Sequence, residues 1–191
     1  AGGDYLSTTA SSDFEITGDF TVEMWINPSA LTNYRRLMGY GVGAGWDAAT
    51  GWCWNWTINV TTNKPEFHYL ISNDLQNSLG VGNTAVVDGV WQHLAVTRSG
   101  NIFRYFYNGL LDFQVSDSTA MAVPSGTNTL GIGRFPGGPG TYDYEGYMDE
   151  IVVTKGEAKY TTNFTPAKSA FPTTNIVIVD DNGGEIGRAH V

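Results

Sequence analysis

Histidine and acidic side chains are the residues here whose chemistry could support catalysis. His93 lies in VWQHLAVTRSG at residues 90–100, without a Ser or Cys at a spacing typical of an activated nucleophile. His68 lies in EFHYLI and His190 in EIGRAHV, so the three histidines are scattered along the chain. They do not show the ligand spacing of a zinc site.

Two Gly-rich segments combine aromatic rings with a carboxylate, which is the chemistry of a sugar site. Sugars stack their C–H faces on Trp and Tyr, while Asn and Asp bind their hydroxyl groups. The segments GAGWDAATGW and FPGGPGTYDY supply the candidate ligand-binding residues Trp46, Asp47, Trp52, Tyr142, Asp143 and Tyr144. The alternative for each ring is packing within its own loop.

The elements that position these loops are strands, because the apolar residues repeat with a period of two. In FTVEMWINP, residues 20–28, Phe20, Val22 and Met24 share one face. In CWNWTINV, residues 53–60, the two faces also differ. One face carries Trp54, Trp56, Ile58 and Val60, and the other carries Asn55, Thr57 and Asn59.

Turn signals connect further strands. QHLAVTR, IFRYFY and LLDFQVS are separated by Ser99-Gly100-Asn101 and by Asn108-Gly109, which predicts a three-stranded meander. TLGIGRF and GYMDEIVVT are predicted strands, and GEAKYTTNFTP is predicted to contain one short helical turn. These short strands predict an all-β sandwich or barrel. The predicted core contains Phe20, Val22, Met24, Trp54, Trp56, Leu94 and Val96.

Composition narrows the range of partners. The 191 residues carry a net charge of −9, with 19 acidic and 10 basic residues. The longest basic cluster is Arg35-Arg36, so we expect no nucleic-acid partner. No apolar run is long enough for a membrane span, and we expect no membrane insertion. Cys53 is the single cysteine, and we interpret it as a small buried hydrophobe.

The order of three segments resembles a known family. GDYLSTTASSDFEITGDFTVEMWINP, GVWQHLAVTRSGNIFRYFYNG and YEGYMDEIVVTKGEAKYTTNFTP resemble the opening, central and closing strands of a laminin G-like domain. Such domains belong to the concanavalin A-like lectin/glucanase group. The resemblance covers roughly residues 3–172. It implies a jelly-roll sandwich of two antiparallel sheets, used for binding and adhesion in extracellular, cell-surface and phage tail proteins.

The resemblance also bears on chemistry. It implies a structural strand position for His93 beside Trp91. Hydrolases of the group carry Glu-X-Asp-X-(X)-Glu on one strand, whereas this chain has Glu145-Gly-Tyr-Met-Asp149-Glu150, so we predict no catalysis. Jelly-roll modules often bind Ca²⁺ through oxygen ligands at the sandwich edge. The resemblance makes Asp149 the first candidate ligand and Asp4 the second.

We expect a sandwich domain over residues 1–172, followed by a strand or the start of a linker over 173–184. We interpret EIGRAHV, residues 185–191, as a non-native tail that fits no strand, because its reverse translation can match a sequencing adapter. The predicted function is a non-catalytic binding or adhesion module, for a glycan or a protein ligand, in a larger extracellular, cell-surface or virion protein. The alternatives are a structural virion module that contacts proteins and a glycoside hydrolase.

Overall fold

The computed structural model describes residues 5–29, 35–43, 51–71, 77–136 and 142–167, and the backbone of 75–76, 176–179 and 185–189. Strands dominate these residues. They are β1 (Leu6–Ser7), β2 (Phe20–Pro28), β3 (Arg35–Gly41), β4 (Trp52–Ile58), β5 (Pro65–Ile71), β6 (Leu75–Val81), β7 (Gln92–Ser99), β8 (Ile102–Tyr107), β9 (Leu110–Ser116), β10 (Thr129–Ile132), β11 (Gly146–Lys155), β12 (Ile176–Val179) and β13 (Glu185–Ala189).

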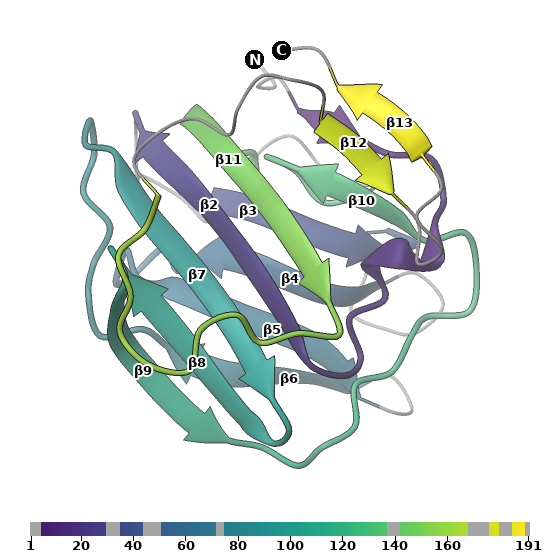
Figure 1. Cartoon of the computed structure of the whole chain (residues 1–191), viewed down its shortest axis with the longest axis horizontal. Coiled ribbons are helices and arrows are strands. Elements are labelled where there is room, and N and C mark those ends of the chain that lie inside the picture. The colour runs from purple at the N-terminus through teal and green to yellow at the C-terminus, as the bar shows by residue number, and fades with distance from the viewer. Residues whose placement is uncertain are drawn as a thin grey trace.

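Two antiparallel sheets face each other. The six-stranded sheet has the order β1-β10-β3-β4-β5-β6, and the five-stranded sheet has the order β11-β2-β7-β8-β9. Figure 1 shows the five-stranded sheet in front and the other behind it. The prediction of a two-sheet antiparallel sandwich is therefore confirmed, including the β7-β8-β9 meander joined through Asn108-Gly109, where both residues adopt positive φ.

The core lies between the sheets and is rich in aromatic rings. It contains every predicted core residue, namely Phe20, Val22, Met24, Trp54, Trp56, Leu94 and Val96. Cys53 is also buried there, and this burial raises the pKa of its thiol to about 12. The alternation seen in β2 and β4 thus points the apolar face of each strand toward the opposite sheet.

The outer face of the five-stranded sheet is crossed by the segment that follows β11, residues 156–167, which we call the covering segment (Figure 1). Hydroxyls on the sheet bind it: Thr21 Oγ1 donates to the Glu157 carbonyl and Thr97 Oγ1 to the Tyr160 carbonyl, both at 2.9 Å. Phe164 N donates to the Gly109 carbonyl at 2.8 Å. The rings of Tyr160 and Phe164 are stacked, with centroids 3.5 Å apart.

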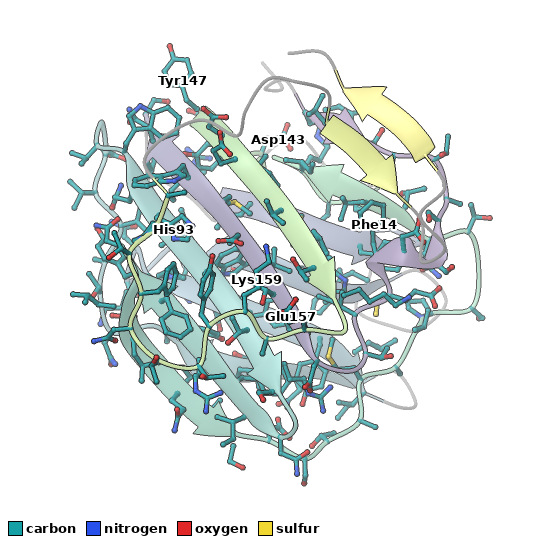
Figure 2. All side chains as sticks on the ribbon, in the orientation of Figure 1. Phe14, His93, Asp143, Tyr147, Glu157 and Lys159 are labelled. Atoms are coloured by element: carbon teal, nitrogen blue, oxygen red, sulfur yellow. The ribbon has the colours of Figure 1, made fainter. Side chains whose placement is uncertain are left out.

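The prediction of a helical turn within this segment is wrong, because its backbone bonds to the sheet rather than to itself. His93 lies under it on β7, as Figure 2 shows, and its ring packs edge-on against Trp25 and Phe164. His93 Nε2 lies 3.3 Å from Glu23 Oε2. His93 thus lies on a strand, as the resemblance implied, and a structural role for it stays a prediction.

Two further local features complete the fold. A 3₁₀ turn at Ser12–Phe14 begins after Ser11, whose hydroxyl accepts the Asp13 N–H. Residues 185–189 form β13, which pairs with β12, although EIGRAHV was expected to fit no strand. The proposed domain boundaries stay predictions. Within the described residues, no helix has the length and apolar character that crossing a membrane requires.

Candidate functional site

A pocket of about 280 Å³ opens on the outer face of the six-stranded sheet. Its floor is polar and comes from three adjacent strands, while aromatic rings line its walls. The lining residues are Arg36 from β3, Trp52, Asn55 and Thr57 from β4, Glu66 and His68 from β5, and Asn59, Phe135 and Tyr142 from the connecting segments.

Strand register sets the floor of the pocket. Thr57 pairs with Arg36 on one side and with Glu66 on the other, so these three side chains form one row across the sheet. Asn55 pairs with Gly39 and His68 and forms the next row. Both rows lie on the face opposite Trp54 and Trp56, because side chains alternate along a strand.

Two β-bulges bring Arg36 and Trp52 to the pocket face. In the pairing of β3 with β4, the extra residue of the first bulge is on β3, between Arg36 and Met38. The extra residue of the second bulge is Cys53 on β4, between Trp52 and Trp54. At each shift two consecutive residues, Leu37-Met38 and Cys53-Trp54, point into the core. A regular strand would therefore have turned Arg36 and Trp52 inward, and the extra residue in each bulge re-aims them.

Phe135 forms the central aromatic wall and sits directly on Gly39. A Cβ atom at Gly39 would come within 2.5 Å of the Phe135 ring, so only glycine leaves room for it. The guanidinium carbon of Arg36 lies 4.1 Å from the centroid of Phe135 and 5.2 Å from that of Tyr142. Trp52 completes the wall, with its centroid 6.3 Å from that of Phe135. The flat apolar faces of these rings thus lie beside the positively charged guanidinium of Arg36.

Three polar atoms of the floor are buried and have no hydrogen-bond partner among the described residues. They are Arg36 Nη1, Asn55 Oδ1 and Thr57 Oγ1. Buried polar groups in folded proteins are nearly always paired with protein or with water, because an unpaired one costs free energy. The residues that carry these atoms come from two neighbouring strands and all line the pocket, so its floor is rich in polar groups.

Glu66 is held at the other side of the floor. Its carboxylate accepts from Asn59 Nδ2 at 2.9 Å and from Ser78 Oγ at 2.8 Å, and His68 Nε2 lies 3.4 Å away. The hydrogen bond from His68 and those from Asn59 and Ser78 lower the pKa of Glu66 to about 2, against the opposing effect of burial. Glu66 is therefore ionised throughout the neutral range.

Arg36 is the cation of the site. Burial lowers the pKa of its guanidinium, while the nearby Tyr142 and Asp143 raise it. A parallel bridge between the backbones of Arg36 and Asp143 brings residues 142–144 alongside β3. The guanidinium remains charged, because arginine does not lose its proton in proteins.

The candidate ligand residues separate in the structure. Trp52 and Tyr142 line the pocket, and Trp52 is only 2% exposed. Asp143 and Tyr144, expected on an exposed loop, are instead 2% and 5% exposed. Asp143 is buried because it forms a salt bridge with Arg134, and Tyr144 because its ring packs in the core. Trp46 and Asp47 lie outside the described residues.

Most of the floor was not predicted as a site. Arg36, Glu66 and His68 are not among the predicted glycan-binding residues, and Asn55 and Thr57 were predicted only to lie on the polar face of their strand. The sequence signal that could have indicated the floor is the polar face of Asn55 and Thr57, which continues on the next strand with Glu66 and His68. Polar residues alternating with large apolar ones on two successive strands indicate a face that is not packed against the core.

Calcium binding stays a prediction. Asp149 lies within β11 with an exposed side chain, and its Oδ1 accepts the backbone N–H of Glu150 at 2.8 Å. Asp4 lies outside the described residues. In the part of the chain that the structure describes, no group of three or more His, Cys, Asp or Glu side chains could hold a metal ion. Asp149 would thus need backbone carbonyls and water to complete a shell.

Known structures share this architecture at low sequence identity. A native heptameric SAP-like pentraxin from Limulus polyphemus matches with a TM-score of 0.55 and 14% identity, over 80% of this chain and 70% of the pentraxin. The CBM40 of a Ruminococcus gnavus IT-sialidase, bound to α2,3 sialyllactose, matches with a TM-score of 0.58 and 13% identity, over 81% and 90%. Mouse laminin α1 domains LG4-5 match with a TM-score of 0.56 and 13% identity, over 80% and 39%.

At these identities the likeness concerns the fold. No curated protein sequence matches the chain. A family model does match, and it spans residues 1–184, which is nearly the whole sequence. The two-sheet sandwich and this coverage agree with one another. The chain belongs to the concanavalin A-like lectin/glucanases superfamily.

Proposed function

We propose that this chain is a non-catalytic carbohydrate-binding module whose ligand occupies the pocket on the six-stranded sheet. One observation carries the proposal: among the described residues, three that hold a buried polar atom without a hydrogen-bond partner line the same pocket as three aromatic rings. A sugar has hydroxyl groups for the polar atoms and C–H faces for the rings. A purely apolar ligand would leave Arg36, Asn55 and Thr57 unpaired, at a cost in free energy.

The acidic groups of the pocket favour binding over hydrolysis. Most glycoside hydrolases need two carboxyl groups, one of which is protonated to act as an acid. Among the described lining residues only Glu66 carries a carboxyl group. Its pKa of about 2 makes it a poor proton donor at neutral pH. The pocket therefore supports recognition of a glycan without cleavage.

The comparisons support a binding role in a larger protein. The Ruminococcus gnavus CBM40, which shares this fold over most of both chains, has α2,3 sialyllactose bound to it. Laminin LG4-5, of which this chain covers 39%, has the same fold. We propose that the module belongs to an extracellular or cell-surface protein, with a glycan as its partner. The virion setting expected from the sequence is a further proposal.

A glycan array followed by calorimetry tests this function. The wild-type chain is expected to bind at least one glycan class. Tyr142→Ala is expected to weaken that binding by about 0.5–1.5 kcal/mol, or roughly 2- to 10-fold, because a stacking surface is lost from the pocket wall. Tyr142 is 38% exposed, so the folded state should tolerate the change.

Tyr147→Ala is the matched control. Tyr147 is 71% exposed, projects from the start of β11 in Figure 2, and is not one of the residues that line the pocket. This change is expected to leave glycan affinity unaltered. Equal loss of affinity in the two variants, or an array on which the folded wild-type chain binds no glycan, would contradict the proposed function.

A further inference from the structure

Arg36 differs from its neighbouring cations in the partners that surround it. Arg35 Nη2 lies 3.3 Å from Glu145 Oε1, and Arg134 is paired with Asp143. Over the other sheet, Lys159 Nζ of the covering segment lies 3.2 Å from Glu23 Oε1 on β2. Within the described ranges Arg36 has no such carboxylate partner, and its guanidinium lies over the Phe135 and Tyr142 rings.

The pocket is the space from which a ligand could bring an acceptor to the Arg36 guanidinium. Its Nη1 atom is buried without a hydrogen-bond partner, and the pocket is the space that its side chain lines. Asp143 lies close enough to raise the pKa of Arg36, but its carboxylate is taken by Arg134. Arginine presents a planar fork of donors that matches a carboxylate, and such charge-assisted pairs are stronger than neutral hydrogen bonds.

The rest of the floor restricts where a negative group could bind. Glu66 would repel an anion, but it lies on β5, whereas Arg36 lies on β3 with β4 between them. At about 4.8 Å between neighbouring strands, their backbones are about 10 Å apart. The Glu66 charge is also compensated by Asn59, Ser78 and His68. Thr57, between Arg36 and Glu66, and the neighbouring Asn55 remain to bind hydroxyl groups.

We propose that the pocket selects sugars that carry a carboxylate, with the carboxylate on Arg36, neighbouring hydroxyls on Thr57 and Asn55, and the ring face against the aromatic wall. This inference rests on the proposed function and names the class of its ligand. The shared chemistry is a carboxylate attached to a pyranose ring, which hexuronic acids and nonulosonic acids both provide. A neutral sugar would fill the same space but leave the Arg36 charge unpaired.

The test compares each acid with its methyl ester, which lacks the negative charge and carries one additional methyl group. Calorimetry would measure the affinity of the wild-type chain for oligogalacturonate and for its methyl ester, with N-acetylneuraminate and its methyl ester as the second source of the same chemistry. In at least one source, the acid is expected to bind at least tenfold more tightly than its ester. Raising salt from 50 to 500 mM is expected to weaken binding of the acid and to leave the ester unchanged.

Two arginine variants locate the effect. Arg36→Gln is expected to abolish the difference between acid and ester, whereas Arg104→Gln is expected to preserve it. Arg104 is a close match, because its Nη1 is also buried without a partner although it lies on β8 of the other sheet. Circular dichroism would verify that each variant is folded, and the wild-type comparison of acid with ester remains decisive if Arg36→Gln does not fold.

Equal or tighter binding of the ester in both sources would overturn the inference and leave the proposed function intact, since sugars would still bind. Retention of the preference for acids by folded Arg36→Gln would also overturn it. A wild-type chain that binds no sugar of any kind would refute both proposals.

Discussion

The Glu66 carboxylate connects the binding pocket to the stability of the sheet. Its donors come from three positions, since Asn59 follows β4, His68 lies on β5 and Ser78 on β6. Together they hold the pKa of Glu66 at about 2, below the ordinary value of 4.5. A carboxyl group with a lowered pKa stabilises the folded state above its unfolded pKa, and this stabilisation is lost as the pH falls through the folded pKa.

The effect of replacing Glu66 on the free energy of unfolding should therefore depend on pH in the acidic range. Glu66→Gln is expected to lower the free energy of unfolding at pH 7 by about 1.5–3 kcal/mol, the worth of hydrogen bonds to a charged group. The deficit should shrink as the pH falls from about 4.5 toward 2, where the wild-type carboxylate becomes protonated. Urea unfolding at several pH values measures both effects. Exposed Glu157→Gln serves as the control, and a deficit independent of pH would contradict the assignment.

Which face of the sheet a residue lies on could be predicted only where the strand alternates regularly. Alternation placed Asn55 and Thr57 on the face opposite Trp54, and the structure confirms this. Arg36 and Trp52 could not be placed in this way, because a bulge reverses the alternation next to each of them. Bulges arise from pairing with a neighbouring strand, and no local sequence pattern predicts these two.

Among the elements, β3 shapes the pocket most directly, through the contact between Gly39 and Phe135. Gly39→Ala is expected to destabilise the fold by about 1–3 kcal/mol, because the added methyl group would collide with a buried ring in a packed site. It should also weaken ligand binding, since Phe135 must leave its place in the pocket wall.

Gly18→Ala is the control for this change, because an added Cβ there meets no atom within 4 Å. Urea unfolding curves of both variants would be compared with the wild type. If Gly39→Ala proved as stable as Gly18→Ala and bound ligand equally well, the packing role of Gly39 would be refuted.

Elements with strong turn signals or regular alternation were predicted from the sequence, and irregular ones were missed. β2, β4 and the β7-β8-β9 meander were predicted close to their observed bounds. β3 was not predicted: its RRLMGYG sequence contains a bulge and two glycines and shows no alternation. The prediction of a helical turn in the covering segment failed because this segment is held by hydrogen bonds from Thr21 and Thr97. Both residues are distant in the sequence, so the local pattern does not indicate these bonds.

At the scale of the whole molecule, the calcium prediction concerns the edge strand β11. Millimolar Ca²⁺ is expected to raise the melting temperature, because a ligand that binds only the folded state stabilises it, by about 2.7 kcal/mol at one hundred times Kd. Asp149→Asn is expected to abolish the rise, whereas exposed Asp88→Asn should not. An unchanged melting curve of the wild type with Ca²⁺ or with a chelator would remove Asp149 from consideration as a ligand.

The bulge at Cys53 has a consequence for how the length of β4 can change over evolution. Gain or loss of one residue usually disrupts a strand, because every side chain beyond that point moves to the other face. Here Cys53 is already a surplus residue, flanked by Trp52 facing outward and Trp54 facing inward. Its deletion would join the two tryptophans in regular alternation without moving either to a new face, at the expense of one small core side chain. A length difference of one residue at this position is thus compatible with the same pocket.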